Sequence, residues 1–156
     1  MFSNISKKLL SVADGEVIQL SRVPDEVFSS GMLGEGFAVL PTSGKIHSPV
    51  KGRINSVTET KHAYTIRSDD GLDILVHIGI DTVKLDGEGF VSLVEEGDEI
   101  GAGDIIANAD LETIREKGYP TVIPVIVTNF EDISSFDIKC GAVRGGKSTA
   151  MTYKKS

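Results

Sequence analysis

Short β-rich runs separated by glycine-containing turns recur along this chain, and this pattern is the strongest constraint on its fold. The runs cover residues 17–20, 37–40, 63–66, 74–76, 105–107 and 122–127. Seventeen glycines are spread through the sequence, as expected where many tight turns need positive φ angles. The pattern predicts an all-β protein, a compact antiparallel β-sandwich or barrel, rather than alternating βαβ units.

Helical signals are few. Residues 110–118 have an acidic first turn, a basic end and a glycine at the stop, which together predict one short helix. A single helical turn is also expected at residues 24–28. The glycine-rich residues 141–148 are expected to form a last turn between strands, in preference to a phosphate-binding loop.

The N-terminal residues carry a weak amphipathic pattern. Phe2, Ile5 and Leu9 share one helical face, so we expect a mobile amphipathic segment over residues 1–12. Docking of this segment to a partner or a membrane surface is the alternative. The chain has no evident linker, repeat or low-complexity tract, so residues 1–156 are expected to form one domain.

Composition argues against several classes of function. Hydrophobic residues make up 40% and charged residues 25% of the chain, as in an ordinary globular protein. No run approaches the ~18 apolar residues of a membrane span, and no signal peptide is visible. The net charge of −7 argues against binding to nucleic acid. Cys140 is the single cysteine, which excludes an intramolecular disulfide and favours a cytoplasmic location.

Two of the three histidines are predicted to face each other across a β-hairpin. Residues 68–71 form a turn signal, and folding the chain at its midpoint places His62 directly opposite His77. Residues paired in this way share a face, with Cβ atoms about 4.5–5.5 Å apart, whereas a one-residue change would put them on opposite faces. Thr60 lies two positions before His62 and is expected on the same face.

A facing pair of histidines permits phosphoryl transfer without a metal ion. A neutral imidazole has one nitrogen that can attack and one that a hydrogen bond can hold. If His77 is the nucleophile, a backbone carbonyl in residues 77–79 can hold its second nitrogen, and His62 can donate a proton to the bound anion. Asp81 and Asp25 are candidates for repelling, orienting or partner-pairing roles near the edge of the site. The alternative is that each histidine is a satisfied core residue.

Other chemical motifs are absent from the sequence. There is no G-x-x-x-x-G-K-[ST] loop for ATP and no H-E-x-x-H metal spacing. We expect no cofactor and no intrinsic metal site, because His62 and His77 alone leave Zn²⁺ two ligands short of its usual four. Only a partner's ligands would complete such a site. His47, which stands in a turn-like segment beside a proline, is expected to belong to the surface.

A longer signature surrounds the second histidine. The signature begins with Gly71 and two positions that any residue can occupy, followed by an apolar run that ends at His77. After His77 it requires Gly79, an aliphatic residue, any residue, Thr82 and Val83. Supporting segments occur at residues 23–28, 60–63, 85–90 and 124–129. On these residues the chain resembles, over nearly all of its length, the glucose-class enzyme IIA of the bacterial phosphoenolpyruvate-dependent sugar phosphotransferase system.

The resemblance implies a β-sandwich that carries a phosphoryl group on a histidine. The phosphocarrier protein HPr would donate the group to Nε2 of His77. The group would then pass to a cysteine on the IIB domain of a glucose-family sugar permease. By the same resemblance, His62 is the hydrogen-bonding partner needed for onward transfer, Thr60 helps to hold the phosphoryl group, and the carbonyl of Gly79 orients the acceptor ring.

The resemblance also implies a surface for partner proteins. Asp25 and Asp81 match acidic residues near the family's site. The expected apolar contact residues are Val27, Phe28, Met32, Leu33, Ile78 and Val83. Glu26 and Thr58 depart from the family pattern and make this face more polar. We expect a free-standing protein, because no membrane span is visible.

A second hypothesis is a regulatory binding module for transporters or metabolic enzymes. Phosphorylation would act as its switch, since a phosphate adds about −1.5 to −2 charges and would repel a partner docked over apolar residues. The two hypotheses can hold together.

Overall fold

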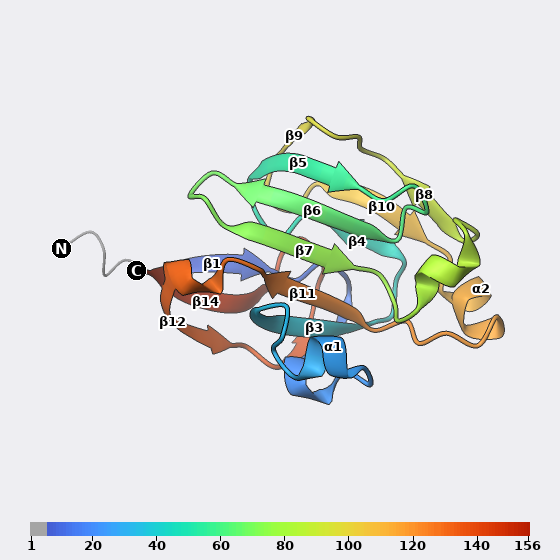
Figure 1. Cartoon of the computed structure of the whole chain (residues 1–156), viewed down its shortest axis with the longest axis horizontal. Coiled ribbons are helices and arrows are strands. Elements are labelled where there is room, and N and C mark those ends of the chain that lie inside the picture. Colours follow the sequence, from blue (N-terminus) through green and yellow to red (C-terminus); the bar gives the residue numbers. More distant parts are fainter. Residues whose placement is uncertain (1–5) are drawn as a thin grey trace.

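The computed structural model describes residues 6–156, and antiparallel β-strands dominate it (Figure 1). The largest sheet has eight strands in the order β13-β2-β3-β11-β7-β6-β5-β9. Its strands are β2 (Gly15–Gln19), β3 (Glu35–Pro41), β5 (Gly52–Val57), β6 (Ala63–Ser68), β7 (Asp73–His77), β9 (Glu99–Ile100), β11 (Ile123–Val127) and β13 (Gly141–Val143). In Figure 1 the labelled strands of this sheet follow one another from β9 at the top through β5, β6, β7 and β11 to β3.

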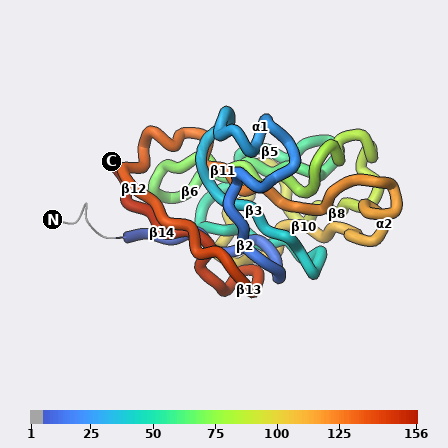
Figure 2. Tube along the Cα trace, turned by 90° about the horizontal axis from the view of Figure 1, so that it is seen from below, coloured from blue at the N-terminus to red at the C-terminus, as the bar shows by residue number. Residues whose placement is uncertain are grey.

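Two three-stranded sheets and a few short helices complete the fold. The sheets are β1 (Lys7–Leu10), β14 (Thr149–Lys155) and β12 (Ile133–Ile138), and β4 (Lys45–His47), β10 (Ile105–Ala109) and β8 (Phe90–Ser92). The helices are α1 (Glu26–Ser29) and α2 (Leu111–Glu116), with the 3₁₀ turns η2 (Leu20–Arg22), η3 (Thr82–Leu85) and η4 (Phe130–Asp132). The C-terminus and β12 lie at the end of the molecule opposite α2 (Figure 2). No helix among residues 6–156 is long and apolar enough to cross a membrane.

The predicted all-β architecture is confirmed, and each predicted strand occurs. The two predicted helical segments also occur, as α1 and α2. The carboxylate of Asp110 accepts the Thr113 N–H at 3.1 Å and begins α2, and Gly118 follows its end with φ 92°. The glycine-rich residues 141–148 contain β13 and the turn that leads to β14, as expected.

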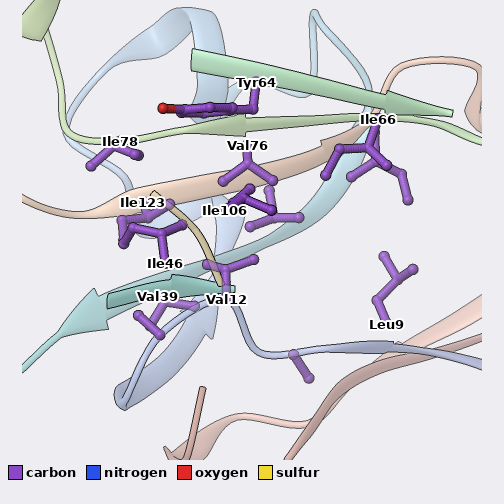
Figure 3. Packing of buried hydrophobic residues seen from close by; sticks show 14 of the residues in the cluster. Leu9, Val12, Val39, Ile46, Tyr64, Ile66, Val76, Ile78, Ile106 and Ile123 are labelled. Atoms are coloured by element: carbon purple, nitrogen blue, oxygen red, sulfur yellow. The ribbon is translucent and has the colours of Figure 1, made fainter. Parts of the chain in front are cut away.

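The main core lies between the sheets and follows the alternation of side chains along the strands. In β7, Ile74 and Val76 are fully buried in this core, whereas Leu75 and His77 point to the other face and are half-buried. Figure 3 shows Tyr64 and Val76 gathered with residues of β3, β4 and β10 in one apolar layer. His77 is therefore presented on the outer face of a rigid central strand.

A second, smaller core covers part of that outer face. It forms where η2 and α1 pack on the large sheet, and its members are Ile18, Leu20, Val23, Phe28, Ala38, Ile80, Val122 and Ile126. In Figure 1, α1 lies against β3. The 3₁₀ turn η2 and the helix α1 thus lie beside the end of β7 that carries His77.

The N-terminal prediction differs from the structure. Residues 7–10 form β1, which pairs antiparallel with β14, and Leu9 is fully buried in the main core. The expected mobile amphipathic segment is therefore wrong for this part of the chain, because β1 completes a sheet with a strand from the other terminus. Phe2 and Ile5 lie outside the described residues.

His47 is also placed differently from the expectation. It ends β4, is half-buried, and its Nδ1 donates to the Gly103 carbonyl at 2.8 Å. A Cβ on Gly146 would lie 2.6 Å from this Nδ1, so the turn before β14 is packed directly on the ring. The local turn signal did not reveal that a distant glycine turn covers this histidine.

Candidate functional site

The two histidines of the sequence signature meet at the ends of β6 and β7. Their ring centroids are 4.9 Å apart and their planes are nearly perpendicular, at 82°. His62 is the residue before β6, and His77 is the last residue of β7. The predicted juxtaposition of the two rings is therefore observed, although the strand register that suggested it is not.

The hairpin register is shifted by one residue from the prediction. Ala63, not His62, is opposite His77, because the loop has three residues instead of two. Gly71 adopts φ 92° and donates its N–H to the Ser68 carbonyl at 3.0 Å, as in a three-residue hairpin loop. The rings still meet because His62 lies outside the regular strand.

The backbone before β6 explains this position of His62. Lys61 has a left-handed conformation, with φ 61°, which breaks the alternation of side chains. The Ile78 N–H then donates to the His62 carbonyl at 2.7 Å and ties this bend to the end of β7. His62 is thereby turned toward the neighbouring histidine, with only 6% of its surface exposed.

The ring of His77 is held by one hydrogen bond and one aromatic contact. Its Nδ1 donates to the Gly79 carbonyl at 2.7 Å. The ring of Phe28, from α1, lies 5.0 Å away between centroids. Because Nδ1 carries the proton of this bond, Nε2 of the neutral ring is left with its lone pair.

Gly79 is required by the geometry of this bond. Its φ is 83°, and a Cβ at this position would lie 2.5 Å from Cγ2 of Thr82 and 2.9 Å from the Pro120 carbonyl oxygen. Its own N–H donates to the Val122 carbonyl at 3.0 Å. The backbone can therefore bend back to His77 only if no side chain is present.

His62 is oriented by hydroxyl groups. The Thr60 Oγ1 lies 2.5 Å from Nδ1 of His62, and the Thr58 Oγ1 lies 3.4 Å from the same atom. The Thr58 Oγ1 also accepts the Ala63 N–H at 3.2 Å and so closes this loop. The Thr60 hydroxyl therefore contacts the ring of His62. Its predicted contact with a bound phosphoryl group stays a prediction.

Burial keeps both imidazoles neutral near pH 7. Desolvation by burial and, to a smaller extent, the neighbouring His77 together lower the pKa of His62 to about 4. Desolvation also lowers the pKa of His77, although the Gly79 carbonyl, Asp25 and Asp81 act in the opposite direction. A neutral His77 is a competent nucleophile, because a protonated Nε2 has no lone pair to donate.

Asp25 precedes both histidines in the sequence, whereas Asp81 follows them. Asp25 begins α1, and its carboxylate accepts the Val27 N–H at 2.9 Å. Asp81 has φ 59° and precedes η3, so a left-handed residue turns the chain after His77. Both carboxylates oppose the lowering of the pKa of His77 by burial. Their predicted repelling, orienting or partner-pairing roles stay predictions.

Replacing Asp25 by Asn should separate its charge from its capping role. Asn is as good a helix cap as Asp, so α1 is expected to remain, while the pKa of His77 falls because a favourable negative charge is lost. Asp25→Ala should also destabilise the protein by about 1 kcal/mol through loss of the cap. The measurement is an NMR pH titration of the His77 ring together with thermal unfolding.

Glu26→Gln is the matched control for this titration. It removes the same charge from an exposed position one residue further along the chain, and Glu26 is not among the groups that shift His77. An unchanged pKa of His77 in Asp25→Asn would contradict the assigned electrostatic role.

The predicted apolar contact residues divide into two groups. Four of them form the apolar rim, which we define as Val27, Met32, Leu33 and Val83, with exposed fractions of 45%, 76%, 37% and 53%. Ile78 is fully buried and Phe28 is 6% exposed, so neither offers the exposed apolar surface that was expected of it. Alternation along the chain turns Ile78 into the main core, while Phe28 anchors α1 and supports His77.

Two neighbours of the histidines were missed by the sequence analysis as site residues. Phe90, at the start of β8, lies 6.5 Å from the His62 ring between centroids. Thr82 is fully buried and donates its hydroxyl to the Ile78 carbonyl at 2.6 Å. Thr82 belongs to the signature in residues 71–83, which was the only sequence signal for it.

The described part of the chain contains no group of three or more His, Cys, Asp or Glu side chains arranged to hold a metal ion. The site itself consists of two neutral imidazoles with hydroxyl and carbonyl partners. Such an arrangement suits a small anion that becomes bonded to one ring nitrogen and hydrogen-bonded to the other.

Comparison with known proteins identifies the family of this chain. Residues 7–133 match the family model described as phosphoenolpyruvate-dependent sugar phosphotransferase system, EIIA 1. The chain belongs to this EIIA family. A solved structure, glucose permease IIA from Mycoplasma capricolum, superposes with a TM-score of 0.88 and 40% identity, over 97% of this chain and 98% of that chain. The β-sandwich implied by the sequence resemblance is thereby confirmed.

Relatives of this EIIA protein include both short and long chains. The glucose-specific EIIA component of Staphylococcus aureus (strain Mu50) is 45% identical over 124 residues, which cover 80% of this chain and 75% of that one. The beta-glucoside-specific EIIBCA component of Bacillus subtilis (strain 168) is 48% identical over 125 residues, or 80% of this chain. This chain spans 20% of the length of that relative and 19% of the glucose-specific EIICBA component of Streptococcus pneumoniae.

Proposed function

We propose that this EIIA protein carries a phosphoryl group on Nε2 of His77 between HPr and a cysteine of a IIB domain. The family makes the chain a phosphotransferase component of a sugar transport system. The observation that carries the finer proposal is the arrangement of His77, whose Nδ1 donates to the Gly79 carbonyl. That bond leaves Nε2 as the nitrogen with a lone pair. A cytoplasmic location, predicted from the single cysteine, is part of this proposal.

The proposed reaction has two phosphoryl transfers. In the first, the Nε2 lone pair of His77 attacks the phosphorus carried by HPr, the P–N bond to Nε2 forms, and the bond to HPr breaks. In the second, a cysteine thiolate of the IIB domain attacks the phosphorus, the P–S bond forms, and the P–N bond breaks. The electron pair of that bond returns to Nε2, so His77 is regenerated as a neutral imidazole.

His62 is proposed to stabilise the phosphoryl group and to assist its departure. A phosphoryl group on His77 places negative charge within reach of the adjacent ring, and that charge raises the pKa of His62 from its value of about 4. The Thr60 hydroxyl can donate to Nδ1 of His62, which leaves an Nε2–H to donate to a phosphoryl oxygen. His62 then neutralises charge where the transfer occurs, which is the main requirement of this reaction.

The apolar rim is proposed to receive both partner proteins. Val27, Met32, Leu33 and Val83 are exposed, and the first three come from α1 and the loop that follows it. An apolar surface that closes over the phosphoryl group excludes water during transfer. Met32 is the most exposed of the four, and its flexible thioether suits contacts with two different proteins.

The direct test is phosphorylation of the purified protein with phosphoenolpyruvate, enzyme I and HPr, followed by intact mass spectrometry. We expect a gain of one phosphoryl mass that is lost on brief acid treatment, as for a phosphoimidazole. Omission of HPr is the control and should prevent the gain. If no mass is gained while an established EIIA protein is labelled in the same mixture, the carrier proposal fails.

A further inference from the structure

Thr82 is a buried polar residue that the proposed transfer chemistry does not use. Its side chain is completely buried, at the first position of η3. Its Oγ1 donates to the Ile78 carbonyl at 2.6 Å, four residues earlier in the chain. This short, buried bond closes residues 78–82 into a loop immediately after His77.

Backbone hydrogen bonds connect the same loop to neighbouring segments of the site. The Ile78 N–H donates to the His62 carbonyl at 2.7 Å, so Ile78 connects the backbone at one histidine with the hydroxyl of Thr82. The Gly79 and Ile80 N–H groups donate to the Val122 and Pro120 carbonyls at 3.0 and 3.1 Å. The loop therefore has a fixed conformation, and the Thr82 side chain is the only side chain of the loop that bonds within it.

The methyl group of Thr82 adds a steric constraint. A Cβ on Gly79 would lie 2.5 Å from Cγ2 of Thr82, which shows how closely this methyl group is packed on the glycine backbone. The carbonyl of that same glycine accepts the Nδ1–H of His77. A shift of the loop by a fraction of an ångström would thus be transmitted directly to the acceptor ring.

We propose that Thr82 is a positioning residue for the phosphoryl acceptor. Its hydroxyl and methyl group together hold the Gly79 carbonyl where it selects the Nδ1–H tautomer of His77 and presents Nε2 to the donor. This inference rests on the proposed function for its kinetic part, whereas its structural part concerns the tautomer of His77 alone.

Thr82→Val and Thr82→Ser are the variants that test this role. Valine keeps the shape of threonine but cannot donate to the Ile78 carbonyl, so the labelling rate from HPr is expected to fall by about 10- to 100-fold, since a small misplacement of reacting groups has effects of this size. Serine keeps the hydroxyl but lacks the methyl group, so its rate should lie between those of Thr82→Val and the wild type. ¹⁵N chemical shifts of His77 should show one tautomer in the wild type and a mixture in Thr82→Val.

Ser48→Ala is the matched control. Ser48 is also fully buried, and its hydroxyl donates to a main-chain carbonyl, that of Val50, at 2.6 Å. It follows β4, outside the signature, and takes part in none of the bonds at the histidine pair. Its loss should lower the melting temperature without changing the labelling rate or the tautomer of His77.

The outcomes separate a positioning role from a merely structural one. A folded Thr82→Val protein with the wild-type rate and a single His77 tautomer would overturn the proposal, as would a Ser variant no better than Val. If the Val variant does not fold, the wild-type ¹⁵N spectrum still decides, because a mixture of His77 tautomers there contradicts the proposal. If wild-type protein is not labelled at all, the carrier function fails, while the tautomer measurement continues to report on Thr82.

Discussion

Replacement of His77 by alanine is expected to abolish phosphoryl acceptance. The variant loses the imidazole whose Nδ1–H bond to the Gly79 carbonyl leaves Nε2 with a lone pair beside the ring of His62. We expect the labelling rate to fall by at least about 1,000-fold, because removal of a nucleophile from a catalytic unit costs several orders of magnitude. The measurement is intact mass after incubation with phosphoenolpyruvate, enzyme I and HPr.

The fold should tolerate this change. His77 is half-buried at the end of a strand, and the residues beneath it, Val76 and Ile78, are fully buried in the main core. Loss of the contact with Phe28 is expected to lower the melting temperature modestly. His47→Gln is a suitable control, since this histidine bonds to Gly103 and lies outside the site. An acid-labile phosphoryl group on His77→Ala would show that another residue is the acceptor.

Replacement of His62 should separate loading from delivery. His62→Gln is expected to accept a phosphoryl group from HPr at a rate within about one order of magnitude of wild type, since the nucleophile and its Gly79 bond remain. Delivery to a purified IIB domain should fall by about 100- to 10,000-fold, the range for loss of a group that exchanges a proton in the transition state. The two half-reactions are measured separately, by loading in the absence of IIB and by single-turnover transfer to it.

The choice of glutamine makes this experiment specific. Its amide can donate a neutral hydrogen bond but cannot take up a proton, so it tests whether His62 must become charged as the phosphoryl group arrives. Thr60→Val is an informative companion, because it removes the hydroxyl 2.5 Å from Nδ1 of His62 while leaving the imidazole in place. Its defect should have the same pattern as His62→Gln but be smaller. Normal delivery by His62→Gln would show that the assigned role is wrong.

The predicted losses in His77→Ala and His62→Gln concern two imidazole rings that differ in their burial and in the charges near them. His62 is 6% exposed and has a pKa of about 4, while His77 is half-buried and lies near two carboxylates. The first ring is costly to protonate until negative charge arrives beside it. The second is neutral and ready to attack. Neutral resting states for both rings follow from burial, which disfavours the imidazolium ion.

Local sequence signals determined the architecture and the identity of the key residues. Glycine-containing turns between short β-rich runs predicted the antiparallel sandwich, because turn chemistry and side-chain alternation act over a few residues. Asp110 and Gly118 marked the limits of α2 for the same reason. The signature in residues 71–83 identified His77, Gly79 and the family, since it preserves a glycine where no side chain fits.

Only the tertiary structure determined how these residues meet. The hairpin loop has three residues, which moves the strand register by one, and the left-handed Lys61 then restores the contact between the rings. Packing of α1 on the outer face of the sheet brings Asp25 and Phe28 to His77, from about fifty residues earlier in the chain.

Burial was the property that sequence alone predicted least well at this site. Ile78 and Phe28 were expected at the contact surface, and the chain before residue 12 was expected to be mobile, yet all of these include core positions. A residue's exposure depends on which distant segment covers it, as β14 pairs with β1 and the large sheet covers Phe28. Sequence by itself therefore determined the strands and the reactive groups, whereas long-range packing decided register, burial and charge at the histidine pair.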